Sequence, residues 1–372
     1  MRWNKIFVAL LPLSFLAAFL HAAAQLAPAQ PDPLAKIRSA AQANPPACSA
    51  TGETLCEQVA PKIIANAQGL SPLAENLRRL TTLTDGVDGP VTGTPAAARA
   101  VAWGVAVFRD AGVDVHTEKY SDGISGPADQ ENVVAEIRGR EKPDEWVLVG
   151  AHLDSWPHGP GVVNNDCDAA MVVEAARDIG VTGIRPRRSI RFVLFTGDEE
   201  DISGPWAYVR AHRAELDRAR AAIVFRSRCL RVTGYWLNGR HDIESGLREA
   251  MKPIESLGAG HSDFGNPLGT DNFDFLLEGV PTLTAVQVPT SHPSNSPAAV
   301  GAPDKIDIAD LKRNTAIVAV TAFGIAELAA PIGPRQSRAE IESLLKTSGL
   351  EGAMKGTRLW PLWKSGERGR LP

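Results

Sequence analysis

Four clusters of polar residues contain side chains that could bind a metal ion or move a proton. They are His152 with Asp154, and the segments 162–168, 198–201 and 226–229. Imidazole and carboxylate groups are common zinc ligands and common general acids and bases. A single acidic run is most often a solvated loop, and that alternative applies to each cluster taken alone. Three of the clusters come directly after apolar runs, which makes one shared metal or acid–base site the better interpretation.

Apolar runs typical of strands alternate with helical patterns over most of the chain. The expected strands are 132–137, 146–150, 190–196, 221–225 and 281–288, and the expected helices are 95–108, 168–180, 204–220 and 308–330. This alternation predicts an α/β fold with a mixed, largely parallel central sheet and helices on both faces. In open sheets of this kind, ligands bind beyond the carboxyl ends of the strands. We therefore expect the polar clusters that follow the strands to share one site.

The composition is that of an ordinary globular protein with enough apolar residues for a large core. Of the 372 residues, 44% are hydrophobic and 22% are charged, and the net charge is −4. This weak negative charge does not favour nucleic acid or an anionic membrane surface as the partner. The predicted organisation is a signal peptide at 1–24, an Ala- and Pro-rich leader at 25–70, one large domain at 71–331 and a tail at 332–372.

The first residues predict export. Arg2 and Lys5 form a short basic start, residues 6–20 are apolar, and the small residues 22–24 form a cleavage site before Gln25. An uncleaved membrane anchor is the alternative, but the apolar run is short for a span. We therefore expect a periplasmic or secreted protein that does not span a membrane after cleavage.

The expected strand 146–150 runs into the motif Gly-Ala-His-Leu-Asp-Ser-Trp at 150–156. Through this motif, its most specific signal, the sequence resembles the zinc exopeptidase family that includes carboxypeptidase Q (plasma glutamate carboxypeptidase) and bacterial secreted aminopeptidases. Other matching segments are 92–96, 108–112, 174–177, 185–195, 269–271 and 279–281. The resemblance implies the zinc-exopeptidase, or phosphorylase/hydrolase-like, fold and peptides or peptide-like molecules as ligands.

The same resemblance implies two zinc ions that share a carboxylate and activate a water molecule, which a glutamate deprotonates. His152 stands at a zinc-ligand position, and Asp154 stands where a carboxylate orients the ligands. The bridging aspartate is expected at position 164, where this chain has Asn164. Asp166 is a poor substitute, because the match has no gap on either side of position 164.

The remaining site positions also follow from the resemblance. Asp198 stands at the general-base position, where the family has glutamate, and Glu199 stands at a retained ligand position. Arg228 stands where the family has a ligand aspartate. His292 matches the last histidine ligand only if the chain has an insertion, and Asp271 in Gly-Thr-Asp is expected to contact substrate.

Arg228 is the substitution that most affects the expected chemistry. A guanidinium group cannot ligate a metal and stays charged. At roughly 4 Å from a dication, with an effective dielectric constant near 20, the repulsion would be about 8 kcal/mol. Asp198 or Glu199 could hold Arg228 in an ion pair instead. We therefore expect a degenerate metal site in which zinc is doubtful and normal peptidase activity is small or absent.

Two alternatives stay open. Arg228 could turn to solvent and leave one zinc ion on His152 and Glu199, as in an active zinc-dependent exopeptidase with an altered ligand set. A noncatalytic binding protein is the other alternative, since the family includes inactive members used as receptors. A single-zinc glutaminyl-cyclase-like site fits less well, because it keeps the carboxylate missing at 164. No Gly-x-Ser-x-Gly elbow supports a serine hydrolase.

Four cysteines permit disulfides in an exported protein. Cys48 and Cys56 lie close together in the leader and are predicted to pair. By the resemblance, Cys167 and Cys229 lie next to former ligand positions and should line one cavity. They could be bonded if their Cα atoms lie within about 7 Å of each other. Two buried thiols are the alternative for this second pair.

Overall fold

This computed structural model describes residues 58–84, 93–121, 130–154, 165–197, 203–227, 229–265, 270–288 and 306–371. All of them belong to one compact unit, residues 44–372. None of the helices in these ranges is long and apolar enough to cross a membrane. The predicted signal peptide and the Cys48–Cys56 pair lie outside the described residues.

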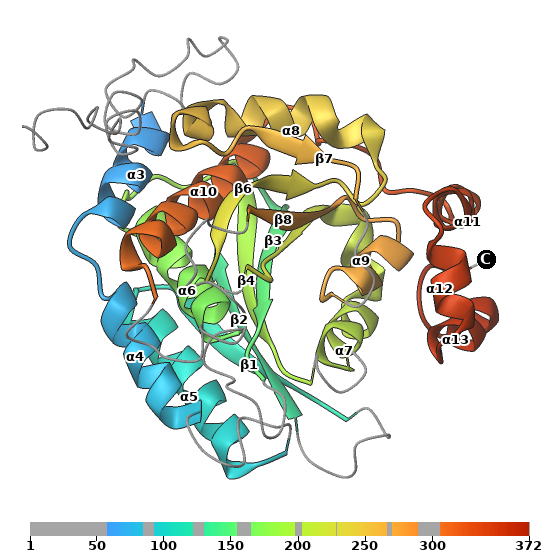
Figure 1. Cartoon of the computed structure of the whole chain (residues 1–372), viewed down its shortest axis with the longest axis horizontal. Coiled ribbons are helices and arrows are strands. Elements are labelled where there is room, and N and C mark those ends of the chain that lie inside the picture. The colour runs from blue at the N-terminus through green and yellow to red at the C-terminus, as the bar shows by residue number, and fades with distance from the viewer. Residues whose placement is uncertain are drawn as a thin grey trace, which may run out of the picture. The chain divides into compact units, whose positions relative to one another are not determined.

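One mixed sheet forms the centre of the described structure (Figure 1). Its strands are β1 (Asp114–Tyr120), β2 (Gln130–Ile137), β3 (Lys142–His152), β4 (Arg188–Phe195), β5 (Ala219–Val224), β6 (Arg231–Trp236), β7 (His261–Asp263) and β8 (Thr282–Val288). Their spatial order is β1-β2-β4-β3-β5-β8-β6-β7. The central strands β4, β3, β5 and β8 are parallel, whereas β1 with β2, β2 with β4, and β6 with β8 pair antiparallel. The predicted mixed, largely parallel sheet is confirmed.

Helices cover both faces of this sheet, as the sequence predicts (Figure 1). They are α3 (Ala60–Gln68), α4 (Leu73–Thr84), α5 (Pro95–Asp110), α6 (Asp166–Gly180), α7 (Ser203–Ala211), α8 (Glu244–Met251), α9 (Phe273–Leu277), α10 (Ile308–Glu327), α11 (Arg338–Thr347), α12 (Leu350–Lys355) and α13 (Leu359–Ser365). On β3, Val147 and Val149 join the buried cluster that includes α5, α6 and α10. Trp146 and Leu148, which alternate with them, join the cluster that includes α7 and α9.

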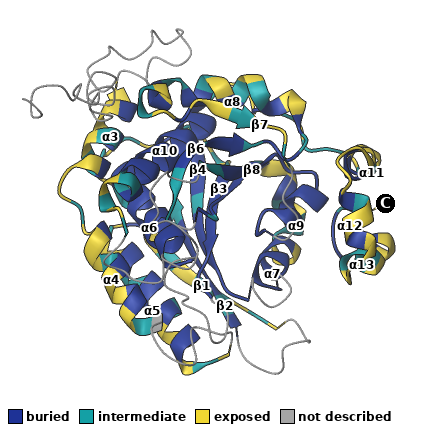
Figure 2. Cartoon of the chain, viewed as in Figure 1, coloured by how far each residue is buried: buried dark blue, intermediate teal, exposed yellow. Residues whose placement is uncertain are grey.

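Burial on both faces explains the composition of the central strands. Figure 2 shows the middle of the sheet as buried and the outer helices as partly exposed. On β3, every residue from Trp146 to His152 is buried. A parallel strand covered on both sides has no solvated face, so its sequence is a continuous apolar run. Polar side chains can follow only where the strand ends.

The N-terminal boundary of the folded domain lies earlier than the sequence predicts. The leader is expected to extend to residue 70, and this boundary is wrong, because α3 belongs to the core. Ala60, Ile63 and Ala67 are buried along one face of α3, at helical spacing. The helix packs against α6 and α10.

The predicted helix 204–220 is too long. α7 ends at Ala211, residues 213–218 form a 3₁₀ helix, and β5 begins at Ala219. In the 3₁₀ segment Leu216 is buried, and Glu215 accepts a hydrogen bond from Arg191 of β4 at 3.1 Å. These contacts with the sheet replace the α-helical turn that local propensity favours.

The side chain of Glu174 and the main chain of Asp178, both in α6, hold the N-terminal helices against the domain. Ser71 Oγ donates to Glu174 Oε1 at 2.6 Å, and Asn66 Nδ2 donates to the main-chain oxygen of Asp178 at 3.2 Å. Arg177 donates to Glu174 Oε1 at 2.7 Å and to Asp178 Oδ1 at 2.6 Å. Burial, followed by the charge of Glu174, raises the pKa of Asp178 to about 8.

We expect the Asp178 carboxyl group to reduce the stability of the protein as the pH rises. Its pKa is about 8 in the folded state and about 4 in an unfolded chain, so the folded state keeps a proton that the unfolded state releases. The contribution of this group to the free energy of unfolding is fully present below about pH 4 and is lost as the pH rises through about 8. Between these values the free energy of unfolding falls by at most about 1.4 kcal/mol per pH unit because of this group. Asp178→Asn should remove this part of the slope when the free energy of unfolding in urea is measured at several pH values. The exposed Asp144→Asn is the control, and an unchanged slope in Asp178→Asn would contradict the prediction.

Candidate functional site

The carboxyl ends of three parallel strands meet at one edge of the sheet. β3 ends at His152, β4 at Phe195 and β5 at Val224. In the parallel register His152 lies beside Phe195, and Gly150 lies beside Val224. The polar segments that follow these strands therefore start next to one another, as the sequence predicts.

His152 forms a well-defined polar contact at this edge. Its Nδ1 atom lies 3.3 Å from Oδ2 of Asp271, and the two side chains are only 2% and 1% exposed. An ionised carboxylate can only accept a hydrogen bond, so ionised Asp271 requires the tautomer with the proton on Nδ1. This tautomer leaves Nε2 as the nitrogen that can accept a hydrogen bond or ligate a metal.

Asp271 reaches His152 from a segment far along the chain. It follows Thr270, whose carbonyl oxygen accepts the amide hydrogen of Phe273, the first residue of α9, at 2.8 Å. The sequence predicts a substrate contact for Asp271 and the orienting role for Asp154. In the structure, the carboxylate beside the Nδ1 atom of His152 is that of Asp271. The two residues are 119 positions apart, so no local pattern could indicate this pairing.

Asp154 connects the end of β3 to the start of α6. Its side chain is buried, and its main-chain oxygen accepts a hydrogen bond from the side-chain amide of Asn165. Asn165 comes directly before α6. The role of Asp154 in orienting metal ligands stays a prediction.

The first turn of α6 holds both residues that flank position 228. Asp168 Oδ2 accepts the amide hydrogen of Ser227 at 2.7 Å, and Asp168 Oδ1 accepts the Ser227 hydroxyl hydrogen. A disulfide joins Cys167 to Cys229, whose Cα atoms are 5.4 Å apart, so this predicted bond is confirmed. The sequence predicts no specific role for Asp168. Its place in a polar run does not indicate which main-chain amide will donate to its carboxylate.

Five of the predicted site positions lie outside the described residues. They are Asn164, Asp198, Glu199, Arg228 and His292. Within the described ranges, no three histidine, cysteine, aspartate or glutamate side chains come together to hold a metal ion. The described residues alone therefore do not fit a zinc ion, and the predicted ligand set stays a prediction.

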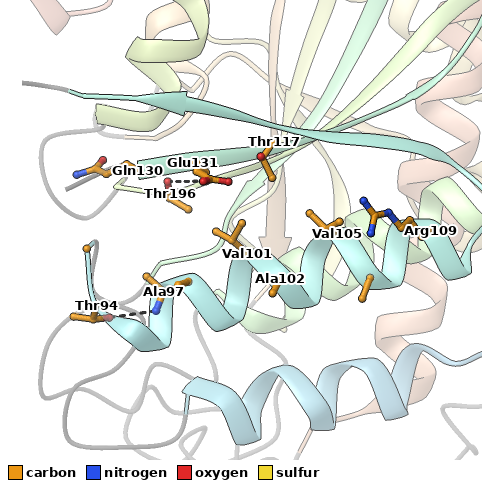
Figure 3. A pocket seen from close by; sticks show the side chains of 13 residues that line it. Thr94, Ala97, Val101, Ala102, Val105, Arg109, Thr117, Gln130, Glu131 and Thr196 are labelled. Carbon is orange, nitrogen blue, oxygen red and sulfur yellow. Dashed lines mark hydrogen bonds between the residues drawn. The ribbon is translucent and has the colours of Figure 1, made fainter.

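A groove of 590 Å³ lies beside the end of β4, between α5 and the strands β1 and β2. Figure 3 shows Val101 and Val105 of α5 facing these strands, with Arg109 toward the far end of the helix. Near the other end, Thr196 Oγ1 donates to the main-chain oxygen of Glu131 at 3.2 Å. The volume is within the range of small-molecule and peptide pockets, which combine apolar walls with a few polar groups.

Comparison with known proteins identifies relatives of this chain. The sequence profile of "Peptidase family M28" matches residues 132–322. Carboxypeptidase Q of Mus musculus is 33% identical over 153 residues, which are 41% of this chain and 32% of that protein. The match thus spans about a third of the length of this curated relative.

Solved structures show the same fold. The peptidase M28 precursor from Shewanella amazonensis superimposes with a TM-score of 0.66 at 18% identity. The superposition covers 77% of this chain and 100% of the other chain. BSAP, a zinc aminopeptidase from Bacillus subtilis, gives a TM-score of 0.54 at 13% identity, covering 70% of this chain and 98% of that one. At these identities the likeness concerns the fold alone.

We expect removal of the Cys167–Cys229 disulfide to destabilise the protein strongly. The bond joins residues 62 positions apart, so its loss should lower the free energy of unfolding by about 4 kcal/mol through the entropy of the unfolded chain. Urea unfolding of Cys167→Ala/Cys229→Ala against the wild type measures the loss. Peptide mapping without reduction should recover the linked pair, and recovery of both cysteines as unmodified thiols would disprove the bond.

Proposed function

We propose that this chain, which belongs to peptidase family M28, is an exported homologue of the metallo-exopeptidases whose metal site is degenerate and whose normal peptidase activity is small or absent. The observation that carries the proposal is the pair of residues at positions 164 and 228. Asparagine and arginine stand there, at positions where the family is expected to have carboxylate ligands. Both positions lie inside the matched region 132–322.

The described residues next to these positions lie close together. The parallel pairing of β3 with β5 continues without a shift from Val147 to Gly150, up to the edge where His152 lies. The disulfide between Cys167 and Cys229 ties the segment after position 164 to the segment after position 228.

Charge balance explains why the substitutions should weaken metal binding. Two zinc ions bring four positive charges, and the three ligand carboxylates expected in the family offset most of them. In this chain Glu199 is the one of the three that is retained, and Arg228 adds a fixed positive charge. Asp198 and Glu199 are well suited to pair with Arg228, which would replace the metal centre by an ion-pair network.

A peptide or peptide-like molecule is the ligand that we propose. His152 and Asp271 lie 3.3 Å apart, between Nδ1 and Oδ2, at the carboxyl end of β3, which is where open α/β sheets bind their ligands. The groove beside Thr196 offers apolar side chains such as Val101 next to this edge. Family membership supports the same class of ligand.

One observation favours an active enzyme as the second candidate. A buried histidine whose second ring nitrogen donates to a carboxylate is the usual arrangement of a metal-bound histidine, and His152 with Asp271 has this form. An active zinc-dependent exopeptidase would then use His152 and Glu199 together with Asp166 or His292, and would hydrolyse unblocked dipeptides.

The purified mature protein should contain clearly less than one zinc ion per chain. Because Arg228 would repel the ion and a bridging carboxylate is missing, neither zinc nor a chelator should change the melting temperature. A ligand at roughly 100 times its dissociation constant adds about 2.7 kcal/mol of stability, which a thermal melt detects. Elemental analysis after dialysis against zinc gives the stoichiometry, and an assay with unblocked dipeptides tests the second candidate.

Matched variants separate the loss of ligands from the change in net charge. Asn164→Asp/Arg228→Asp should bind zinc more tightly than either single variant, because it returns two carboxylates and removes a cation. Arg226→Asp is the control for the single variant Arg228→Asp, since it makes the same charge change two residues away from the ligand position. Two tightly held zinc ions in the unmutated protein would overturn the proposal and place the chain among the active exopeptidases.

Export should remove the first 24 residues of the sequence. Mass spectrometry of periplasmic or secreted protein should find the mature terminus at or near Gln25. The Cys167–Cys229 disulfide supports this expectation, because such bonds persist in oxidising compartments. Full-length protein retained in the cytosol would contradict it.

A further inference from the structure

We propose that the C-terminal segment 335–371 positions Asp271 against His152, and that Arg368 is the positioning residue, acting through Asp274. The proposal rests on the proposed function in one respect, namely that the His152–Asp271 pair is part of the ligand site. It assigns a role to a segment for which the sequence predicts only an appended tail.

Asp271 lies just before a helix that cannot be stable by itself. α9, Phe273–Leu277, has five residues, and all of them are buried. A helix this short makes too few internal hydrogen bonds to offset the entropy of ordering its backbone. The position of Asp271 therefore depends on what packs against α9.

Aromatic contacts hold the face of α9 that packs toward the sheet. The ring of Phe275 lies 6.5 Å from that of Phe195 and 6.1 Å from that of Tyr208, between ring centroids. Phe195 is the last residue of β4 and lies beside His152 in the parallel register. This contact places α9 next to the strand ends but does not determine the rotation of the helix about its own axis.

A buried ion pair fixes the other side of α9. Arg368 Nε donates to Asp274 Oδ1 at 2.7 Å, and Arg368 Nη2 donates to Asp274 Oδ2 at 2.7 Å. The two side chains are 3% and 1% exposed. The guanidinium group also lies over the ring of Trp206 in α7, 5.0 Å from its centroid. A two-point pair of this kind determines orientation as well as distance.

Further contacts join the C-terminal segment to the end of α9. The amide of Arg370 donates to the carbonyl oxygen of Leu277 at 2.9 Å. Arg335 Nη2 donates to the buried carboxylate of Glu278, the residue after α9, at 2.8 Å. The segment thus binds α9 through the main chain as well as through side chains.

Apolar side chains complete this interface. Phe273 and Leu277 of α9 share one buried cluster with Ile341 of α11, Met354 of α12 and Trp363 of α13. Without the C-terminal helices this face of α9 would be exposed to water. The segment is therefore part of the support of α9.

Loss of Arg368 should move Asp271 because both carboxylates belong to one turn of the chain. Asp274 lies three residues after Asp271, and a carboxylate left unpaired in the interior is strongly unfavourable. α9 would shift or open so that Asp274 reaches water. The contact between His152 and Asp271, at 3.3 Å, is already near the long limit of a hydrogen bond, so a shift of about 1 Å would break it.

Nuclear magnetic resonance of the full chain tests the proposal without metal or substrate. Histidine is labelled with ¹⁵N, and the His152 ring signals are assigned from the spectrum of His152→Gln. At one fixed pH, Asp271→Ala should shift the Nδ1 signal and remove the hydrogen-bonded proton of His152. We expect Arg368→Gln to move the signals in the same direction, with loss of the same proton.

A second two-point ion pair, in which the arginine is 34% exposed, lies at the opposite ends of the strands and provides the control. Arg140 donates to Glu327 at 2.7 and 2.5 Å, so Arg140→Gln also removes a two-point pair but does not touch α9. Its His152 signals should stay at the wild-type position. Wild-type signals in Arg368→Gln, with a loss of stability like that of Arg140→Gln, would overturn the proposal.

Arg335→Gln keeps the test decisive if Arg368→Gln does not fold. It removes two bonds to Glu278, one to the carboxylate and one to the main-chain oxygen. The carboxylate still accepts from Arg213 at 3.0 Å. Its His152 signals should shift in the same direction as those of Asp271→Ala, but by less. If they do not shift, the segment does not position Asp271. Because no step depends on zinc or hydrolysis, failure of the proposed function would leave this result unaffected.

Discussion

Parallel pairing of β3 with β4 and β5 is the constraint on which the candidate site depends. It brings three carboxyl ends to one edge of the sheet, and helices on both faces exclude water from the strands themselves. Polar side chains can therefore enter only where each strand ends. His152, Thr196 and Ser227 all occupy such positions.

Burial at this edge requires that each carboxylate has donors close by, because an isolated buried charge is strongly disfavoured. Asp168 is bound by the amide and hydroxyl groups of Ser227, and Asp271 lies beside His152. Asp274 is bound by Arg368 on the far side of α9. Replacing carboxylates by neutral or cationic residues changes this balance of charge directly. For this reason, we base the proposed loss of metal binding on Asn164 and Arg228, which stand where the family is expected to have carboxylates.

The folded unit extends beyond the region that matches the family. The profile covers 132–322, yet α3 is buried against α6 and α10, and α11 to α13 are buried against α9. Each added segment covers an apolar face that would otherwise meet water. The N-terminal helices are held through the carboxylate of Glu174 in α6, and the C-terminal helices through the ion pair of α9. Segments outside the matched region are therefore part of the folded domain.

The sequence by itself determined the central strands, their polar ends, the position of His152 and the class of fold, because hydrophobic periodicity and strand ends are local properties of the chain. Only the tertiary structure decided which carboxylate lies beside His152, 119 positions away, and which arginine neutralises Asp274, 94 positions away. It also decided that α3 belongs to the core. Several buried carboxylates follow strands in this sequence, and any of them could have reached the imidazole. The choice among them depends on how several helices pack at once, and no local pattern records that packing.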